Sequence, residues 1–282
     1  MDEGPRNNCL KETAMRYLVV FSTKDEAGIN ISKHLKLYPK PPFEVFQVEK
    51  DLIELQAGDI PESDLVIFAS KHVGKRPSFT VHVSGNPGSS APFGGLPRSL
   101  SMSAPLPMLF CLESMVKQAV PGFEVTYEVT HHGPSFLKTP SFFAELGSGP
   151  EQWSVEEYAG VVAASIYKAA ELAASNIDVK TALGLGGPHY APNITRYALR
   201  NRVAVGHIIQ GSILEEEDDI GSLLRLALDA NGKTDTVLID WKGVNGATRA
   251  KILTELKLFG LPVIRVRAVR RHFHLVKMVL YR

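Results

Sequence analysis

Short apolar runs separated by polar turns dominate the first half of the chain. Residues 16–21 and 65–69 are apolar at almost every position, which is typical of strands buried on both faces. Residues 43–48, 79–84 and 124–130 alternate between apolar and polar side chains, as strands with one buried face do. The pattern therefore predicts five strands in this half of the chain.

Helical periodicity is found in three segments of the same region. Residues 29–37 are predicted to form a helix that ends before a cluster of prolines, and residues 108–119 a second helix. The strongest pattern covers residues 154–174, where apolar side chains recur every three or four positions. Ser154 and Glu157 have the spacing of a capping box, so this helix is predicted to begin at Ser154.

Two stretches show no regular pattern. Residues 85–105 are rich in Gly, Pro and Ser, and a long aperiodic stretch of this kind is typical of a loop over a functional site. Residues 144–149 read Ala-Glu-Leu-Gly-Ser-Gly and are assigned to neither a helix nor a strand.

Strands and helices alternate in the second half of the chain. Strands are predicted at 180–185, 203–210, 236–241, 263–269 and 273–280, with helices at 192–201, 220–228 and 245–259 between them. This order predicts an α/β fold, layered around a central mixed, mostly parallel sheet that is flanked by helices. We expect residues 15–282 to form a single catalytic domain, because no linker or repeat interrupts them, and residues 1–14 to form a loose leader.

Composition excludes a membrane protein and leaves the partner open. The formal net charge of +1 argues neither for nor against a polyanionic partner, so nucleic-acid binding would need a local basic patch. The two cysteines, Cys9 and Cys111, fit no metal or redox spacing, which is typical of a reduced cytoplasmic protein. The most apolar long stretch, residues 159–174, contains Lys168 and Glu171 and is too short to span a bilayer.

A glycine turn at residues 183–195 joins a predicted strand to a predicted helix. It is not a P-loop, because no Gly-Lys-Ser/Thr follows. It is not a dinucleotide fingerprint either, because His189 stands where the third glycine belongs. Pro192 is well placed as the first residue of the helix. Two interpretations remain: a binding site at the start of this helix, or a tight turn with an exposed histidine.

Histidines gather where the predicted strands end. These are His72, His82, His131, His132 and His189. Sites in open α/β sheets form at the carboxyl ends of strands, and imidazoles together with the nearby Glu128 and Glu145 would suit zinc. The adjacent His131 and His132 cannot both point the same way in an extended strand, so we expect at most one ligand unless the chain turns there. The alternative for each histidine is an ordinary hydrogen-bonded or surface role.

Two further features are the absence of a motif for covalent catalysis and a set of basic side chains. No Gly-x-Ser-x-Gly elbow or activated cysteine is present, so attack by water is favoured over covalent catalysis. Basic side chains that could hold a phosphate backbone are Lys71, Lys75, Arg76, Arg98, Arg265 and Arg267. An ordinary solvated strand face is the alternative for the last two.

A set of motifs in fixed order resembles a known family. The motifs are Ser70-Lys71-His72, His82-Val83-Ser84-Gly85-Asn86, Thr130-His131-His132-Gly133-Pro134, Glu145-Leu146-Gly147-Ser148, Gly184-Leu185-Gly186-Gly187-Pro188-His189-Tyr190-Ala191-Pro192 and Gly206-His207-Ile208. Together they resemble the D-aminoacyl-tRNA deacylases of archaea and plants over residues 15–281. The resemblance implies a monomeric, cytoplasmic, zinc-dependent hydrolase with a phosphorylase/peptidyl-tRNA hydrolase-like architecture. It also implies cleavage of the ester that joins a D-amino acid, such as D-tyrosine, to the terminal ribose of tRNA.

Roles for individual residues follow as hypotheses. The expected metal ligands are His82, His132, His189 and Glu128, and the expected catalytic residues are His131, Glu145 and His72. Substrate binding is expected at Gly186, Gly187, Tyr190 and Asn86, and tRNA binding at the six basic residues named above. A metal-dependent aminopeptidase, a peptidyl-tRNA hydrolase and a non-catalytic tRNA-binding protein remain as alternatives.

Overall fold

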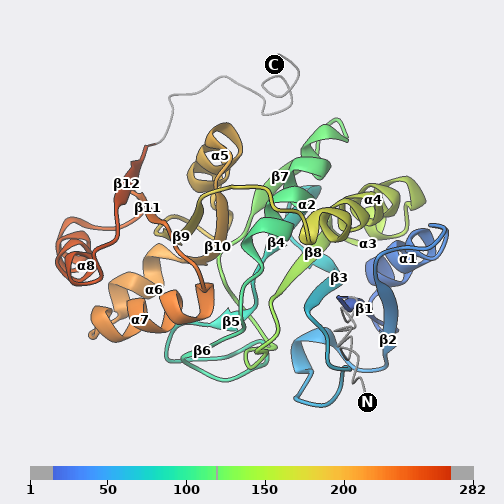
Figure 1. The fold of residues 1–282 in the computed structure, drawn as a ribbon, viewed down its shortest axis with the longest axis horizontal. Helices are drawn as coiled ribbons and strands as arrows, with labels where there is room; N and C mark the ends of the chain where they lie inside the picture. The colour runs from blue at the N-terminus through green and yellow to red at the C-terminus, as the bar shows by residue number, and fades with distance from the viewer. Residues whose placement is uncertain (1–14, 119, 268–282) are drawn as a thin grey trace, which may run out of the picture.

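The computed structural model describes residues 15–118 and 120–267, and it confirms the predicted α/β class with a central, mostly parallel sheet flanked by helices (Figure 1). The predicted leader at 1–14 and the predicted strand at 273–280 lie outside the described residues. The division into domains stays a prediction.

A six-stranded sheet forms the first half of the molecule. Its strands, in spatial order, are β2 (Glu44–Val48), β1 (Tyr17–Ser22), β3 (Leu65–Val73), β8 (Ser141–Ser148), β4 (Ser78–His82) and β7 (Glu124–Tyr127). All neighbours are parallel except β4 and β8, which run antiparallel. The mixed sheet therefore places β8 between β3 and β4, with its second half paired to both strands.

Strand β8 is the element that the sequence pattern missed. It lies near the middle of the sheet and is buried along its whole length. Phe142, Ala144 and Leu146 join the core on one face, and Phe143 joins the core on the other. Glu145 interrupts this apolar pattern with a side chain that is only 3% exposed. A buried carboxylate is costly unless it is paired, so Glu145 is a candidate functional residue.

A second sheet of four parallel strands lies beside the first. Its order is β10 (Ala204–Ile209), β9 (Thr181–Leu185), β11 (Thr236–Asp240) and β12 (Val263–Val266). The stretch after β7 connects the two sheets, because the Val129 amide donates to the His189 carbonyl at 2.9 Å and the Thr130 amide to the Ile208 carbonyl at 2.8 Å. The Glu128 amide still donates to the Val81 carbonyl of β4 at 3.0 Å, so the chain leaves the first sheet at residues 129–130, whereas the prediction extended the first-sheet strand to residue 130.

Helices cover both sheets (Figure 1). They are α1 (Glu26–Leu35), α2 (Pro105–Lys117), α3 (Pro150–Trp153), α4 (Glu156–Ala173), α5 (Pro192–Asn201), α6 (Gly211–Glu216), α7 (Ile220–Asn231) and α8 (Gly246–Leu258), with a short 3₁₀ turn, η1, at Leu52–Glu54. Helices α1, α2 and α4 pack against the six-stranded sheet. Helices α7 and α8 contribute apolar side chains to the core of the four-stranded sheet.

The predicted capping box at the start of α4 is wrong. The cap residue is Val155, without a side-chain cap bond, while the Ser154 hydroxyl donates to the Pro150 carbonyl at 2.9 Å. Ser154 ends the separate short helix α3, so its hydroxyl is used there. The aperiodic stretch at 85–105 contains a small ribbon of β5 (Gly85–Asn86) and β6 (Ser99–Leu100), which stands between β4 and α2.

A buried histidine ties the connecting stretch to the second sheet. The fully buried His207 in β10 lies 2.9 Å from the Thr130 hydroxyl through Nδ1 and 2.9 Å from the Ser101 carbonyl through Nε2. Since a carbonyl only accepts, Nε2 carries the proton and Nδ1 accepts from Thr130. Burial lowers the pKa of His207 to about 4, which keeps this ring neutral at pH 7.

We expect His207 to make the fold acid-sensitive. Its pKa lies near 6.5 when unfolded and at about 4 when folded, so the unfolded chain binds the proton first as the pH falls. Stability therefore declines between about pH 6.5 and pH 4, by about 3 kcal/mol from this group. In His207→Gln, the free energy of unfolding should depend less steeply on pH over this interval, as urea denaturation would measure.

The control for this prediction is His34→Gln, at a half-buried position on α1 away from the two sheets' junction. Its pH dependence should match that of the parent protein. An unchanged slope in His207→Gln would show that His207 is not responsible.

Candidate active site

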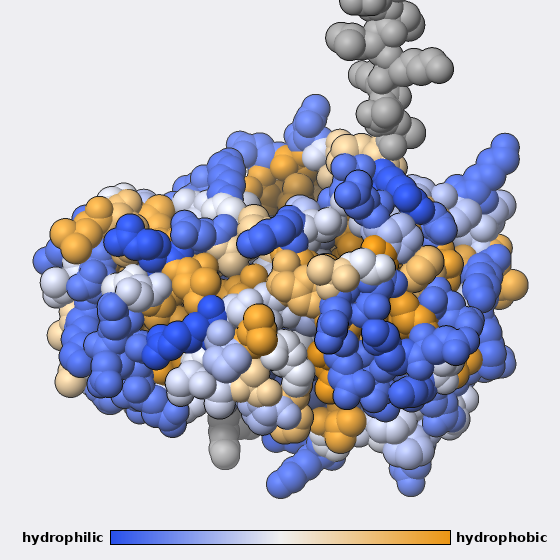
Figure 2. Space-filling view, turned by 90° about the horizontal axis from the view of Figure 1, so that it is seen from below, coloured by the Kyte–Doolittle hydropathy of each residue, from blue (hydrophilic) through white to orange (hydrophobic). Residues whose placement is uncertain are grey.

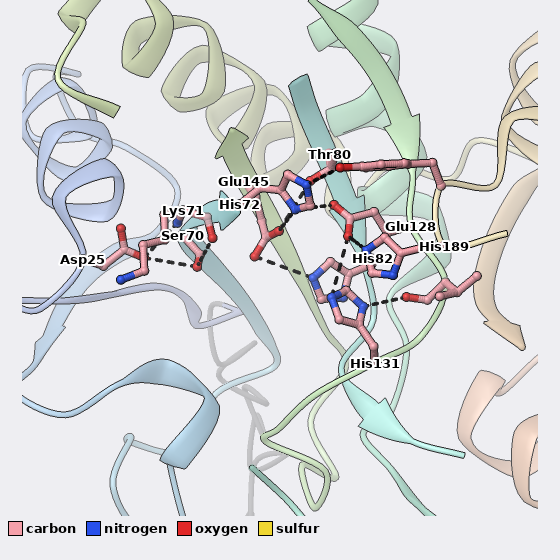
Figure 3. Close-up of polar contacts among 12 residues, drawn as sticks. Asp25, Ser70, Lys71, His72, Thr80, His82, Glu128, His131, Glu145 and His189 are labelled. Carbon is pink, nitrogen blue, oxygen red and sulfur yellow. Dashed lines mark hydrogen bonds and ion pairs between the residues drawn. The ribbon is translucent and has the colours of Figure 1, made fainter. Parts of the chain in front are cut away.

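Five histidines and two glutamates converge in one cluster, which Figure 3 shows in part. Its members are His72, His82, Glu128, His131, His132, Glu145 and His189, which are the expected metal-binding and catalytic residues together. We call this set the His/Glu cluster. His72 comes from β3, His82 ends β4 and Glu145 lies in β8, all neighbours in the six-stranded sheet. The others come from the stretch after β7 and from the turn after β9.

The two carboxylates enclose His72. Its Nδ1 lies 3.0 Å from Glu128 Oε1 and 3.5 Å from Glu145 Oε2. The second Glu128 oxygen lies 2.7 Å from His189 Nε2, and the second Glu145 oxygen lies 3.6 Å from His82 Nε2. Each buried carboxylate is therefore held between two imidazoles.

These contacts set the charges of the cluster. Burial opposes ionisation of both glutamates, but hydrogen bonds from His189 and His72 hold the pKa of Glu128 well below its usual range. Burial is likewise outweighed at Glu145, where the charge of His82 and the bond from His72 lower the pKa to about 2. Burial also opposes the charged form of His72, yet Glu128 and Glu145 raise its pKa to about 11. Both carboxylates are thus ionised at neutral pH.

Three other imidazoles each use Nδ1 to donate a hydrogen bond to a nearby backbone carbonyl. The Nδ1 of His82 donates to the carbonyl of the next residue at 3.3 Å. In the same way, Nδ1 of His131 donates to the carbonyl two residues earlier at 2.8 Å, and Nδ1 of His132 to that of the next residue at 2.7 Å. With Nδ1 used as the donor, the neutral ring presents its lone pair on Nε2. The Nε2 of His82 is buried and has no hydrogen-bond partner among the described residues.

The chain turns between the two adjacent histidines. His132 has a φ of 49°, in the left-handed region, and this turn lets both rings face the same space. The ring centroids of His131 and His132 lie 4.4 Å apart, and they lie 4.3 and 4.8 Å from that of His82. The expectation that at most one of these two histidines is a ligand applied to an extended strand. Because the chain turns at His132, both rings can face the same site.

The cluster offers three overlapping groups with the ligand atoms for a metal ion. The groups are His82/His131/His132, Glu128/His131/His189 and His72/Glu128/Glu145, and within each group the candidate ligand atoms lie within 4.8 Å of one another. Imidazole nitrogens and carboxylate oxygens at this spacing fit a borderline divalent cation. Burial disfavours protonation of His82, but Glu145 outweighs burial and raises its pKa. The carboxylates thus favour a positive charge here, whether a proton or a metal supplies it.

A cavity of about 590 Å³ opens beside the cluster. Cluster members on its wall are His72, His131, His132, Glu145 and His189. Its lining also includes Asp25, Ser70 and Lys71, where Asp25 caps α1 and accepts from the Lys71 amide at 2.8 Å (Figure 3). A volume of this size is typical of small-molecule sites. Sequence reasoning missed Asp25, although a capping aspartate directly after a buried strand was a readable signal.

Apolar side chains complete the cavity. Leu52, Ile53, Val73 and Phe93 line it, and Phe93 is 64% exposed. Figure 2 shows that apolar residues lie in patches among hydrophilic ones on the face that it presents. The cavity therefore combines a charged, metal-ligating end with apolar walls, as sites for organic ligands do.

The expected substrate-binding residues lie in different surroundings. Tyr190 belongs to the site, because its hydroxyl lies 2.6 Å from His72 Nε2. The amides of Gly186 and Gly187 are taken by the carbonyls of Ile209 and Gly243, at 2.8 and 3.1 Å. Both glycines have φ near +90°, and a Cβ on Gly186 would lie 2.5 Å from a Val244 methyl. These glycines shape the turn that carries His189 rather than presenting free amides to a ligand.

Asn86 orders the loop beside the cavity. Its side-chain amide donates to the Gly94 carbonyl at 2.8 Å, and it does not line the cavity. A Cβ on Gly94 would lie 2.1 Å from the Ile53 carbonyl, so this loop crosses η1 at close range. The contacts fix the segment that presents Phe93 to the cavity.

The six basic residues do not form one patch. Lys71 lines the cavity, and Lys75 and Arg76 lie in the turn between β3 and β4. Two arginines are paired with acids, Arg76 with Glu124 at 2.6 Å and Arg98 with Glu217 at 2.7 Å. The other two, Arg265 in β12 and Arg267 just beyond it, lie on the outer strand of the second sheet.

The chain is similar to known proteins of one family. The family model described as D-aminoacyl-tRNA deacylase matches residues 60–264. The D-aminoacyl-tRNA deacylase of Methanocaldococcus jannaschii is 32% identical over 264 residues, which cover 89% of this chain and 100% of the relative. That of Thermococcus kodakarensis is 38% identical over 215 residues, covering 76% and 77%.

The fold is also seen in a solved structure. The crystal structure of the conserved protein of unknown function AF0625 superposes with a TM-score of 0.83 and 32% identity, covering 89% of this chain and 95% of that one. Within the described part of the chain, none of the helices has the length and apolar character needed to span a bilayer.

Proposed function

This chain belongs to the D-aminoacyl-tRNA deacylase family, and from that premise we propose that it hydrolyses the ester between a D-amino acid and the terminal ribose of tRNA. The products are the free D-amino acid and tRNA. The observation that carries the proposal is the buried His/Glu cluster at one end of a ligand-sized cavity. We further propose that the protein acts in the cytoplasm, where tRNA is charged and used in translation, and that it is a monomer.

We propose zinc as the cofactor, held by Nε2 of His82, His131 and His132. Their Nδ1 atoms already donate to backbone carbonyls, which fixes the tautomer that a ligand needs. The two Glu128 oxygens already contact His72 and His189. These contacts disfavour metal binding by the two candidate groups that contain Glu128. When bound, zinc would act as a Lewis acid toward the ester carbonyl or water.

Glu145 is the proposed proton acceptor. It is ionised, lines the cavity and has an oxygen 3.4 Å from the Thr80 hydroxyl. As water attacks the ester carbonyl, its carboxylate would take the proton from that water. The same proton would pass to the ribose oxygen when the ester bond breaks, so the reaction consumes one water and leaves the enzyme unchanged.

His72 and Tyr190 would act as positioning residues for this step. The hydroxyl of Tyr190 lies 2.6 Å from one nitrogen of His72, whose other nitrogen faces both glutamates. This chain of contacts restricts rotation of both carboxylates. Groups that are already oriented lose less entropy on reaching the transition state, so they react faster.

A comparison of three substrates tests the proposed function. Release of free amino acid or peptide would be measured from D-aminoacyl-tRNA, L-aminoacyl-tRNA and N-blocked peptidyl-tRNA, each with and without a zinc chelator. We expect rapid hydrolysis of the D-ester alone, loss of that activity on chelation, and recovery with added zinc. A preference for peptidyl-tRNA or for the L-ester would identify a different hydrolase, and tRNA binding without turnover a non-catalytic protein.

A further inference from the structure

Two arginines stack on one tryptophan beside the second sheet. Trp241 directly follows β11, and its ring centroid lies 4.4 Å from Cζ of Arg249 and 4.0 Å from Cζ of Arg265. Arg249, on α8, also donates to the carbonyls of Trp241 and Val244 at 2.7 and 2.8 Å. The indole thus holds two guanidinium groups from different elements, which leaves each with fewer conformations to lose on binding.

No acid balances this charge within residues 15–118 and 120–267. Arg249, Arg265 and Arg267 form no ion pair there, whereas Arg76 and Arg98 are both paired with glutamates. The adjacent Asp240 is buried and accepts from the Asn193 amide at 3.0 Å, so its carboxylate faces inward. Desolvation and the charges of Arg267 and Arg249 lower the pKa of Arg265, as expected for a guanidinium group with two cations nearby.

The turn that carries Trp241 lies beside the turn that carries His189. Strands β9 and β11 are parallel neighbours, so the turns that follow them lie at the same edge of the sheet. The turn after β9 carries His189, and its Gly187 amide donates to the Gly243 carbonyl in the turn after β11 at 3.1 Å. A chain-like ligand that leaves the cavity past His189 would therefore reach Trp241 next.

We propose that Trp241, Arg249, Arg265 and Arg267 form a docking surface for the sugar–phosphate backbone of the RNA substrate outside the cavity. Guanidinium groups bind phosphate through paired N–H donors, and crowded like charges without an acid gain most from such a partner. The identity of the partner as tRNA rests on the proposed function. The surface itself does not touch the reacting ester, so it acts on binding rather than on the chemical step.

The test compares a long and a short substrate. In the double variant Arg265→Gln/Arg267→Gln, we expect KM for D-aminoacyl-tRNA to rise at least about tenfold at 0.15 M salt, with kcat unchanged. The slope of log affinity against log salt should fall by about 2, one for each lost phosphate contact. Hydrolysis of a D-aminoacyl-adenosine ester, which does not reach this surface, should show the parent kinetics.

Arg225→Gln is the matched control, because Arg225 also stacks on an aromatic ring, that of Phe259, at 5.5 Å. Phe259 lies ten residues beyond Arg249 along α8, about 15 Å away, so this variant should bind tRNA normally. Equal KM values for the double variant and the parent, or an equal loss with the short ester, would overturn the proposal.

A binding measurement separates this proposal from the proposed function. Fluorescence anisotropy with uncharged tRNA requires no turnover, so it reports on the surface even if the parent protein hydrolyses none of the three esters. Weaker, less salt-dependent binding by the double variant supports the docking surface in either case. Identical binding curves for the parent, the double variant and Arg225→Gln contradict it.

Discussion

Replacing His131 with alanine should lower kcat/KM for D-aminoacyl-tRNA roughly 1,000-fold or more, because it removes one imidazole from the proposed zinc site. His131 is the only histidine shared by two of the three potential metal-binding groups in the described part of the chain. Its loss should also reduce the zinc content of the purified protein. Steady-state kinetics together with metal analysis of the same preparation would measure both effects.

His34→Ala is the control for this variant, since His34 lies on α1 outside the His/Glu cluster. It should keep full zinc content and activity. Circular dichroism and thermal unfolding would establish that His131→Ala is folded. If the folded variant retained both its zinc and its activity, the proposed metal site would be wrong.

Replacing Glu145 with glutamine should lower kcat by roughly 100- to 10,000-fold, the range typical for loss of a general base. The amide has nearly the shape of the carboxylate but cannot accept the proton from water. Because Glu145 is not among the proposed ligands, zinc content should stay close to that of the parent protein. This combination of full metal and lost turnover distinguishes a base from a ligand.

Glu113→Gln is the matched control, at a half-buried position on α2 outside the His/Glu cluster, where Glu113 pairs with Arg202 at 3.0 Å. Its kcat should equal that of the parent protein. If Glu145→Gln kept more than a tenth of the parent kcat, Glu128 would become the better candidate for the base, and the same substitution there would decide between them.

The sequence pattern predicted the uniformly apolar strands better than β8, whose apolar run contains a buried carboxylate. β1 and the first part of β3 are uniform apolar runs, and burial on both faces produces such runs directly. β8 has the same environment, but Glu145 and Gly147 interrupt its pattern. A buried carboxylate is tolerated there because partners from other strands bind it, and a local pattern holds no information on those partners.

The candidate site was predictable as a set of residues but not as an arrangement. Histidines at strand ends indicated a cluster, because the strand ends of a sheet meet at its edges. The turn at His132 and the contact of Glu128 with His189 depend on backbone conformation and on pairing between distant segments. The stacking of Arg265 on Trp241 joins a residue of β12 to the residue that follows β11, and a local sequence pattern does not predict such a contact.

The bonds between the two sheets also set the order in which the site can be completed. Six of the seven residues of the His/Glu cluster precede residue 150, and the seventh, His189, follows only after α4 and β9. A nascent chain that has folded its first sheet would therefore hold Glu128 without His189 and His72 without Tyr190. The proposed zinc ligands and Glu145 are therefore synthesised first, whereas the contacts that position Glu128 and His72 form only when the turn after β9 packs beside the stretch that follows β7.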